Sequence, residues 1–321
     1  MKPTISAVIP VYNGQKFIKE AIESIQNQTV NVDEIIIIND GSTDKSSAIV
    51  EQLKSDSLIP INMFYQSNGG VSTARNLGIL KSSSDLIAFL DVDDLWHSTK
   101  IEEQLACYKD SKHYEEFSFC DFYFNEPKDD VRKFKISQQI QPLIKSDISR
   151  LSFQLAFIKE NFVGTASTVM FNRELAQKIG GFNANLNHSE DFDFILRYSN
   201  HAEMKILNKS LVTKRTHDNN LSGNDVLHFW SHVFSLQQNI TINSPYTRFN
   251  YPVDVIVLMK KSHDDYLIKY CNSLYEKIKH KSFHAFVTGL HQTQTNRGRL
   301  NLTLALLKKL LRWASFETIK R

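Results

Sequence analysis

The chain has 321 residues, of which 41% are hydrophobic, and a formal net charge of +3. This length suggests about two domains with a sizeable core, the composition excludes a mainly disordered chain, and so small a charge gives no argument for a nucleic-acid partner. The cysteines, Cys107, Cys120 and Cys271, are odd in number and far apart, so neither a disulfide framework nor a zinc site is expected.

Strand-like and helix-like segments alternate in the first part of the chain. Runs of β-branched residues predict strands, and apolar residues at helical spacing predict helices between them. The strands are expected at 5–12, 33–40, 61–66 and 85–91, and the helices at about 17–25, 42–53 and 69–83. Strands separated by helices indicate βαβ units, so the predicted fold class is α/β with a mostly parallel central sheet flanked by helices.

Polar residues follow each of these predicted strands, at 12–13, 39–42, 68–70 and 91–94. Asn, Asp, Gly and Ser are common in turns, so a single group of this kind would carry no functional meaning. The carboxyl ends of parallel strands meet at one edge of a sheet, where ligands bind. We therefore expect these groups to converge on a common site.

The run AFLDVDDLW at 88–96 sets the carboxylates of Asp91, Asp93 and Asp94 at the end of a predicted strand. Like charges this close repel and raise one another's pKa, and a bound cation would relieve the repulsion. Hard divalent ions such as Mg²⁺ or Mn²⁺ prefer oxygen ligands of this kind. A solvated acidic turn or a helix cap is the commoner alternative, and Asp94 fits a cap best.

Weaker strand and helix patterns continue through the second half of the chain. A polar and basic surface loop is expected from 126 to about 150, and the sequence is mainly helical from about 226. Between the loop and the helical region, one predicted helix begins with acidic residues and another is ended by two glycines. The expected elements are strands at 117–125 and 165–171 and helices at 173–182 and 190–200.

Several motifs occur in a fixed order along the first two thirds of the chain. They are VIPVYN (8–13), INDGSTD (38–44), NGGVSTARNLGI (68–79), LIAFLDVDD (86–94), GGF (180–182), SED (189–191) and KRTH (214–217). Together they resemble the family 2 glycosyltransferases, which are inverting enzymes that use nucleotide sugars and have the GT-A fold. The resemblance implies a GT-A domain over 1–223, with a nucleotide-binding part (1–125) and an acceptor and catalytic part (150–223). A helical region, 224–321, would follow.

The resemblance also implies roles for individual residues. Asp91 and Asp93 match the D-x-D motif, in which Asp93 coordinates Mg²⁺ or Mn²⁺ on the donor diphosphate and Asp91 reaches the ribose or the metal. His217 matches a histidine that meets the metal or the diphosphate, with Lys214 and Arg215 adding positive charge nearby. Asp191 matches the catalytic base. The residues assigned to the nucleotide sugar are Pro10, Tyr12, Asn13, Asp40, Asn68, Gly70, Arg75, Asp91, Val92 and Glu190.

Some of these residues also have simpler structural interpretations. Asp40 matches the acid that accepts a hydrogen bond from uracil N3–H, which favours a UDP-sugar, although thymine carries the same group. Arg75 either contacts the diphosphate or braces the D-x-D loop, and alone it would suggest a surface ion pair. Tyr12 fits a base-stacking residue, but aromatic residues at strand ends usually only pack. Glu190 and Asp191 alone would suggest acids that complement a helix dipole.

The expected function is a metal-dependent inverting hexosyl- or N-acetylhexosaminyltransferase. It would move a sugar from a nucleotide diphosphate sugar to a hydroxyl of a glycan or lipid-linked acceptor in surface polysaccharide assembly. A catalytically silent sugar-nucleotide-binding scaffold is the first alternative. A nucleotidyltransferase is the second, and the missing glycine-rich, lysine-bearing triphosphate loop argues against it. The oligomeric state is left open.

The last residues suggest contact with a membrane surface. No stretch reaches the roughly 18 nearly uncharged apolar residues that a spanning helix needs, and no signal peptide is visible, so a cytoplasmic protein is expected. At 298–321, leucines such as Leu300, Leu304 and Leu307 recur at helical spacing beside Lys308 and Arg312. Such a helix either attaches the protein peripherally to the inner face of the cell membrane or packs on the protein itself.

Overall fold

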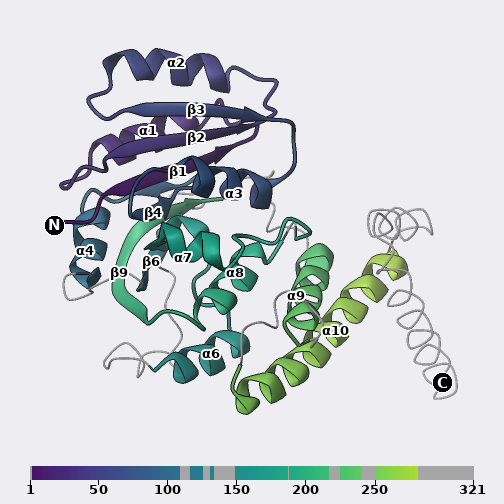
Figure 1. The fold of residues 1–321 in the computed structure, drawn as a ribbon. Helices are drawn as coiled ribbons and strands as arrows, with labels where there is room; N and C mark the ends of the chain where they lie inside the picture. Colours follow the sequence, from purple (N-terminus) through teal and green to yellow (C-terminus); the bar gives the residue numbers. More distant parts are fainter. Residues whose placement is uncertain are drawn as a thin grey trace, which may run out of the picture.

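A curled mixed sheet with helices on both faces forms the centre of the protein (Figure 1). The computed structural model describes residues 2–108, 116–125, 131–133, 149–186, 188–216, 225–240 and 251–280. The strands are β1 (Ile5–Val11), β2 (Glu34–Asp40), β3 (Ile61–Gln66), β4 (Leu86–Phe89), β5 (Leu95–Trp96), β6 (Phe117–Asn125), β7 (Val131–Lys133), β8 (Val169–Asn172) and β9 (Met204–Arg215). The strand order is β3-β2-β1-β4-β8-β6-β9-β5, with β7 beside β6.

The helices cover this sheet and extend beyond it. They are α1 (Ile18–Gln26), α2 (Ser46–Asp56), α3 (Val71–Lys81), α4 (Lys100–Leu105), α6 (Arg150–Lys159), α7 (Arg173–Lys178), α8 (Glu190–Tyr198), α9 (Asp225–Ile240) and α10 (Val253–His280). In Figure 1, α9 and α10 lie beside each other, away from β1, β2 and β3. The helical character predicted from about residue 226 is therefore confirmed for α9 and α10.

The direction of the strands changes across the sheet. Strands β3, β2, β1 and β4 are mutually parallel, so their carboxyl ends meet at one edge. Strand β8 runs antiparallel to both β4 and β6, and β9 pairs parallel to β6. The α/β class is confirmed, and the edge that was expected to collect the polar turns is the carboxyl edge of the parallel part.

Alternate residues of β1 and β2 face two separate hydrophobic cores, which is why both strands are buried throughout. Val8 and Ile36 face α3, whereas Ala7 and Ile9 face α1. Helix α3 approaches closely because Gly78 lacks a side chain, since a Cβ there would lie 2.3 Å from a Val8 methyl carbon. This contact fixes the position of the helix that carries Arg75.

Local structure differs from the sequence prediction at several points. The strand predicted at 165–171 begins instead with a short 3₁₀ turn, η2 (Ala166–Thr168), that leads into β8. The helix predicted at 173–182 ends at Lys178, because Gly180 and Gly181 take φ values of 87° and 65°. Helices α4 and α6 and the long strand β9 were not predicted. Strand β9 carries lysines and pairs with β6 through a register shift, which hides its alternation.

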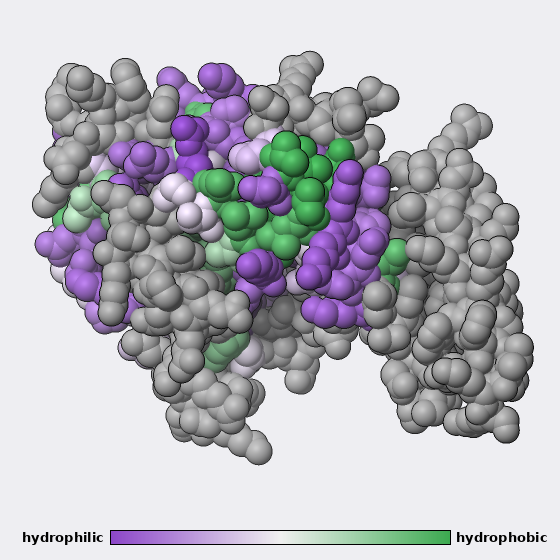
Figure 2. Space-filling view, turned by 90° about the horizontal axis from the view of Figure 1, so that it is seen from below, coloured by the Kyte–Doolittle hydropathy of each residue, from purple (hydrophilic) through white to green (hydrophobic). Residues whose placement is uncertain are grey.

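Helix α6 and the first turns of α10 expose apolar side chains at Leu151, Val253 and Val257. Figure 2 views the molecule from the side of these helices and shows a hydrophobic area beside a group of polar side chains. In the described ranges, no helix is both long and apolar enough to cross a membrane. His217 and the segment 298–321 lie outside the described residues, so their predicted roles and the domain boundary at 223 stay predictions.

Candidate active site

The turns that follow β1, β2 and β4 meet at the carboxyl edge of the sheet. Asn13, which has a left-handed backbone with φ of 51°, donates its N–H to Ser42 Oγ at 3.0 Å. Its side-chain oxygen accepts from the N–H of Thr43 at 2.9 Å. Gly14 allows a close approach to the acidic turn, since a Cβ there would lie 2.7 Å from a Val92 methyl carbon. The predicted convergence of Asn13 and Val92 is thus present.

Asp40 organises the loop that follows β3. This buried carboxylate accepts hydrogen bonds from the backbone N–H groups of Gly69 and Gly70 at 2.8 and 2.9 Å, and from the Gln66 amide at 2.7 Å. Asn68 lies beside the turn that follows β2, because a Cβ added at Gly41 would lie 2.9 Å from the backbone nitrogen of Asn68. The structure therefore brings Asp40, Asn68 and Gly70 together, and contact with a nucleotide base stays a prediction.

Pro10 and Tyr12 occupy the end of β1. Pro10 is buried and lies opposite Ile38 in the sheet. Tyr12 follows the strand and is 54% exposed, although it is aromatic. An exposed aromatic ring beside a polar turn is available for stacking on a planar ligand, whereas the packing alternative would have buried it.

Asp94 holds the acidic turn against the rest of the fold. Its carboxylate is 2% exposed and accepts from Ser167 Oγ at 2.6 Å, from Thr165 Oγ1 at 3.1 Å and from the N–H of Arg215 at 3.3 Å. Its own N–H donates to the Asp91 carbonyl at 2.9 Å, which closes the turn. Asp94 therefore anchors the turn. It is not the helix cap that the sequence suggested, because β5 (Leu95–Trp96) follows it and α4 begins only at Lys100.

The pKa of Asp94 is raised to about 7, by burial first and then by the negative charges of Asp91 and Asp93. The repulsion inferred from the sequence is therefore present in the folded chain. Positive charge brought to this turn would favour the ionised form of Asp94.

Asp91 and Asp93 keep more contact with solvent than Asp94 does. The Asp91 side chain is 25% exposed, with one oxygen held by Arg75 at 2.7 Å and the other accepting from Thr165 Oγ1 at 3.2 Å. Asp93 is partly exposed, and its backbone carbonyl accepts from Arg215 Nε. The two carboxylates of the D-x-D motif thus lie at the accessible side of a tightly held turn.

Arg75 joins this turn to α8. The guanidinium is nearly fully buried, and it contacts Asp91 and Glu190 at 2.7 Å each through different nitrogens. It also lies over the rings of Phe89 and Phe182, 5.8 and 5.3 Å from their centroids. Burial acts to lower the pKa of Arg75, but the charges of Asp91 and Glu190 outweigh it and raise the pKa. Arg75 is therefore a fixed positive charge within the site, as the bracing alternative proposed.

Helix α8 begins at Glu190 and carries Asp191 in its first turn. Burial and the charge of Asp191 raise the pKa of Glu190, and Arg75 opposes them. Asp191 itself is partly exposed, and its carboxylate accepts from the N–H of Phe192 at 2.7 Å. Ser189 precedes the helix with φ of 55°, an uncommon left-handed conformation for a residue other than glycine.

A buried ion pair fixes α8 to its surroundings. Asp193 and Arg197 contact at 2.8 Å with no exposed side-chain surface, and Arg197 also donates to the carbonyls of Ile179 and Gly181. Asn239 of α9 donates to Asp193 at 3.0 Å. These bonds tie the helix that carries Asp191 to both the glycine turn and the helical region. No role was predicted from the sequence for Asp193, Arg197 or Asn239.

The acidic turn can offer ligands to a divalent ion. Among the residues that the structure describes, no group of three or more His, Cys, Asp or Glu side chains is arranged to hold one. Magnesium in phosphate-binding sites commonly uses one or two carboxylates together with substrate phosphates and water. The hard oxygens of Asp91 and Asp93 therefore fit an ion that binds together with a diphosphate.

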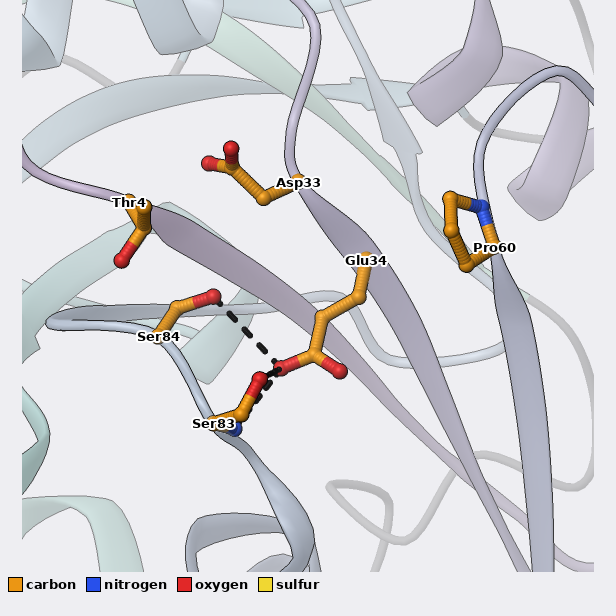
Figure 3. Close-up of a pocket in the computed structure, with 6 residues that line it drawn as sticks. All are labelled: Thr4, Asp33, Glu34, Pro60, Ser83 and Ser84. Carbon is orange, nitrogen blue, oxygen red and sulfur yellow. Dashed lines mark hydrogen bonds between the residues drawn. The ribbon is translucent and has the colours of Figure 1, made fainter.

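A pocket at the opposite edge of the sheet has a different character (Figure 3). It lies at the amino ends of β2 and β4, where Glu34 accepts hydrogen bonds from Ser83 at 2.7 and 2.9 Å and from Ser84 at 3.5 Å. Ser6 donates to the same carboxylate at 2.6 Å. These groups bond to one another and join the starts of the strands, so this pocket is separate from the candidate active site.

The family of this protein is shown by comparison with known sequences. Residues 6–180 match the family model described as glycosyl transferase family 2, and the chain belongs to this family. An uncharacterized glycosyltransferase of Rickettsia typhi is 30% identical over 216 residues, which cover 67% of this chain and 65% of the relative. The uncharacterized glycosyltransferase EpsJ of Bacillus subtilis is 30% identical over 226 residues, covering 69% of this chain and 64% of the relative. The chain thus spans just under two thirds of each relative.

Solved structures confirm the GT-A fold. The crystal structure of S. aureus TarS 1-349 has a TM-score of 0.62 at 16% identity, covering 87% of this chain and 76% of that chain. The mannosyltransferase PcManGT from Pyrobaculum calidifontis, in complex with GDP-Man and Mn²⁺, has a TM-score of 0.60 at 13% identity, covering 99% and 88%. At these identities the similarity concerns the fold alone.

Proposed function

We propose that the protein is a metal-dependent inverting glycosyltransferase. It transfers a sugar from a nucleotide diphosphate sugar, with UDP favoured, to a hydroxyl of a glycan or a lipid-linked acceptor. The observation that carries this proposal is the bridge made by Arg75. It links Asp91 of the D-x-D turn to Glu190, whose neighbour is Asp191, so the acids proposed to act on donor and acceptor belong to one rigid unit.

The donor side of the reaction uses the acidic turn. Asp93 and Asp91 would hold Mg²⁺ or Mn²⁺, and the bound ion supplies positive charge to the diphosphate as it leaves. Arg75 keeps Asp91 in place by a short charged hydrogen bond. The planar guanidinium of an arginine can bond to two carboxylates at once, and a lysine does not match this geometry. Asp40 and Tyr12 would bind the base. Support for UDP comes from Asp40 and from the structure of TarS in complex with UDP-GlcNAc.

The acceptor side uses Asp191. A single in-line displacement needs one base to take the proton of the attacking hydroxyl and charge stabilisation on the opposite side of the anomeric carbon. Asp191 is partly exposed, whereas Glu190 is engaged by Arg75, so Asp191 is the acid of this pair that is free to meet an acceptor. A single displacement of this kind inverts the configuration at the anomeric carbon.

A donor screen tests this proposal. The full chain is incubated with UDP-, GDP- and dTDP-sugars, with Mn²⁺, Mg²⁺ or EDTA, and with glycan and polyprenyl-linked acceptors. We expect a UDP-sugar with Mn²⁺ to raise Tm, and UDP release to require both the acceptor and the metal. The Asp93→Ala variant should lose the metal-dependent Tm shift. Release of pyrophosphate from a nucleoside triphosphate would instead show a nucleotidyltransferase, and donor binding without transfer to any acceptor would favour a binding scaffold.

The proposed setting of the reaction is the inner face of the cell membrane. Assembly of a surface polysaccharide at the inner face of the cell membrane would place a lipid-linked acceptor near the leucine- and lysine-rich segment 298–321. A vesicle flotation assay with anionic lipids, comparing the full chain with Lys308→Glu and Arg312→Glu variants, tests this attachment. Equal flotation of all variants would contradict it.

A further inference from the structure

Arg215, the last residue of β9, contacts the acidic turn at its centre. Its Nε donates to the backbone carbonyl of Asp93, and its backbone N–H donates to a carboxylate oxygen of Asp94 at 3.3 Å. Arg215 is 122 residues from Asp93 and 121 residues from Asp94 in the sequence. Arg215 therefore holds the main chain of the residue proposed to bind the metal, as well as the carboxylate next to it.

The other end of the guanidinium is fixed on α1 and the residue before it. Nη1 of Arg215 forms an ion pair with Glu20, and the guanidinium lies over the ring of Phe17, 4.8 Å from its centroid. The Arg215 side chain is 13% exposed and the Glu20 side chain is 58% exposed, so solvent and salt weaken the ion pair with Glu20 more than the hydrogen bond to Asp93. Arg215 thus joins the start of α1 to the turn after β4.

Three separate parts of the chain restrain this turn. Arg75 and Thr165 hold Asp91, Ser167 and Thr165 hold Asp94, and Arg215 holds the backbone of Asp93 between them. Thr165 Oγ1 lies 3.2 Å from the Asp91 carboxylate and 3.1 Å from the Asp94 carboxylate, so these like charges lie close together and repel one another. Without a restraint at the centre, the turn can relax in the direction that separates Asp93 from its neighbours.

We propose that Arg215 is a positioning residue that keeps the Asp91–Asp94 turn in the shape required to bind a divalent ion with a nucleotide diphosphate. This inference rests on the proposed function. The sequence suggested that Arg215 adds positive charge near the diphosphate. In the structure, its guanidinium donates to the Asp93 carbonyl and pairs with Glu20, so it also acts on the ligand through the turn.

The test combines amide hydrogen exchange with metal binding. Arg215→Ala, Arg215→Lys and Glu20→Gln are compared with the wild-type chain. The Asp94 amide reports on the turn, because it donates to the Asp91 carbonyl. Mn²⁺ binding in the presence of UDP is measured by calorimetry. Lys209→Ala is the matched control, since Lys209 is exposed, lies on the same strand and pairs with half-buried Glu103.

We expect Arg215→Ala to speed exchange of the Asp94 amide and to weaken Mn²⁺ binding about tenfold, the effect of losing one hydrogen bond to a charged group. Lysine should restore part of the loss, because it supplies one of the two contacts. Glu20→Gln, a change at an exposed side chain, should act in the same direction more weakly. In kinetics the apparent KM for the metal should rise more than kcat falls. Lys209→Ala should match the wild type.

Unchanged exchange and unchanged Mn²⁺ affinity in Arg215→Ala and Glu20→Gln would overturn the proposal. A fall in Tm with wild-type metal binding would also overturn it, because that result describes a residue that only stabilises the fold. If the wild-type chain binds neither Mn²⁺ nor UDP, the proposed function fails. In that case, faster exchange of the Asp94 amide in the variants would still show that Arg215 restrains the turn. Failure of the proposed function and failure of the role of Arg215 are therefore distinguishable.

Discussion

Arg75 and Glu190 are 115 residues apart in the sequence, yet their side chains meet at 2.7 Å in a buried ion pair. The same guanidinium contacts Asp91 at 2.7 Å. Because Glu190 begins α8 and Asp91 follows β4, this contact sets the distance between the D-x-D turn and the helix that carries Asp191. The geometry of the candidate active site therefore depends on a residue that need not touch either substrate.

Removing Arg75 should destabilise the protein as well as the site. Arg75→Ala leaves the carboxylates of Asp91 and Glu190 without their partner, and breaking a buried pair in this way costs about 3–5 kcal/mol. Arg75→Lys should recover part of this loss, since lysine reaches one carboxylate. Urea denaturation measures the change. The control is Lys19→Ala in the exposed Lys19–Glu23 pair at 3.8 Å, which should change stability by less than about 1 kcal/mol. Equal effects of Arg75→Ala and Lys19→Ala would contradict the bridge.

The parallel part of the sheet was predictable because its signals are local. Strand β1 is mostly apolar, β2 contains an uninterrupted run of isoleucines at 35–38, and apolar residues of α1 recur at helical spacing. The polar residues after each strand follow the topology directly, so the convergence of Asn13, Asp40 and Asp91 could be read from order alone. These features need no knowledge of which distant segments pack together.

The anchors of the site were not predictable in the same way. Ser167 and Thr165 reach Asp94 across 73 and 71 residues, and Arg215 reaches Asp93 across 122. Hydroxyl residues in the run TAST suggest only a turn or a polar strand, and their partners depend on how η2 and β9 pack against β4. The sequence indicated the acids of the site and offered Arg75 as a brace, but it did not indicate that Ser167, Thr165 and Arg215 hold the turn.

Asp191→Asn should separate binding from transfer. A positioned general base contributes about 10²- to 10⁴-fold, so kcat should fall by that factor while the affinity for Mn²⁺ and UDP stays within about twofold of wild type. Single-turnover transfer and calorimetry measure the two properties. Asp254→Asn is a matched control, because Asp254 is an exposed acid in the first turn of α10. Normal transfer by Asp191→Asn, with the acceptor that the wild type uses, would rule out the base assignment.

Gly78→Ala tests the packing that positions Arg75. Alanine favours a helix over glycine by about 1 kcal/mol, but its Cβ would lie 2.3 Å from a Val8 methyl carbon. Overpacking of a core costs about 1–3 kcal/mol, so we expect a net loss of stability and a weaker Mn²⁺–UDP complex. Gln52→Ala on the exposed face of α2 should be neutral. A gain in stability for Gly78→Ala would mean that α3 can shift away from β1 at little cost.

Glu34 should make the stability of the fold depend on pH at the edge of the sheet opposite the active site (Figure 3). Burial acts to raise the pKa of Glu34, but hydrogen bonds from Ser6, Ser83 and Ser84 outweigh it and lower the pKa below its ordinary value of 4.5. The folded state therefore favours the ionised form. This contribution is complete above the pKa of the unfolded chain and is lost as the pH falls through the lower pKa of the folded chain.

Glu34→Gln should accordingly cost about 1–3 kcal/mol at pH 7, the range for hydrogen bonds to a charged group. The difference from wild type should shrink as the pH falls below about 4, because protonation removes the charge from the wild-type side chain as well. Urea denaturation at a series of pH values measures this difference. Glu51→Gln, at an exposed carboxylate of α2, is the control and should give no pH-dependent difference. If the stability cost of Glu34→Gln stays constant down to pH 3, the shape of the Glu34 side chain, and not its charge, joins the starts of β2 and β4.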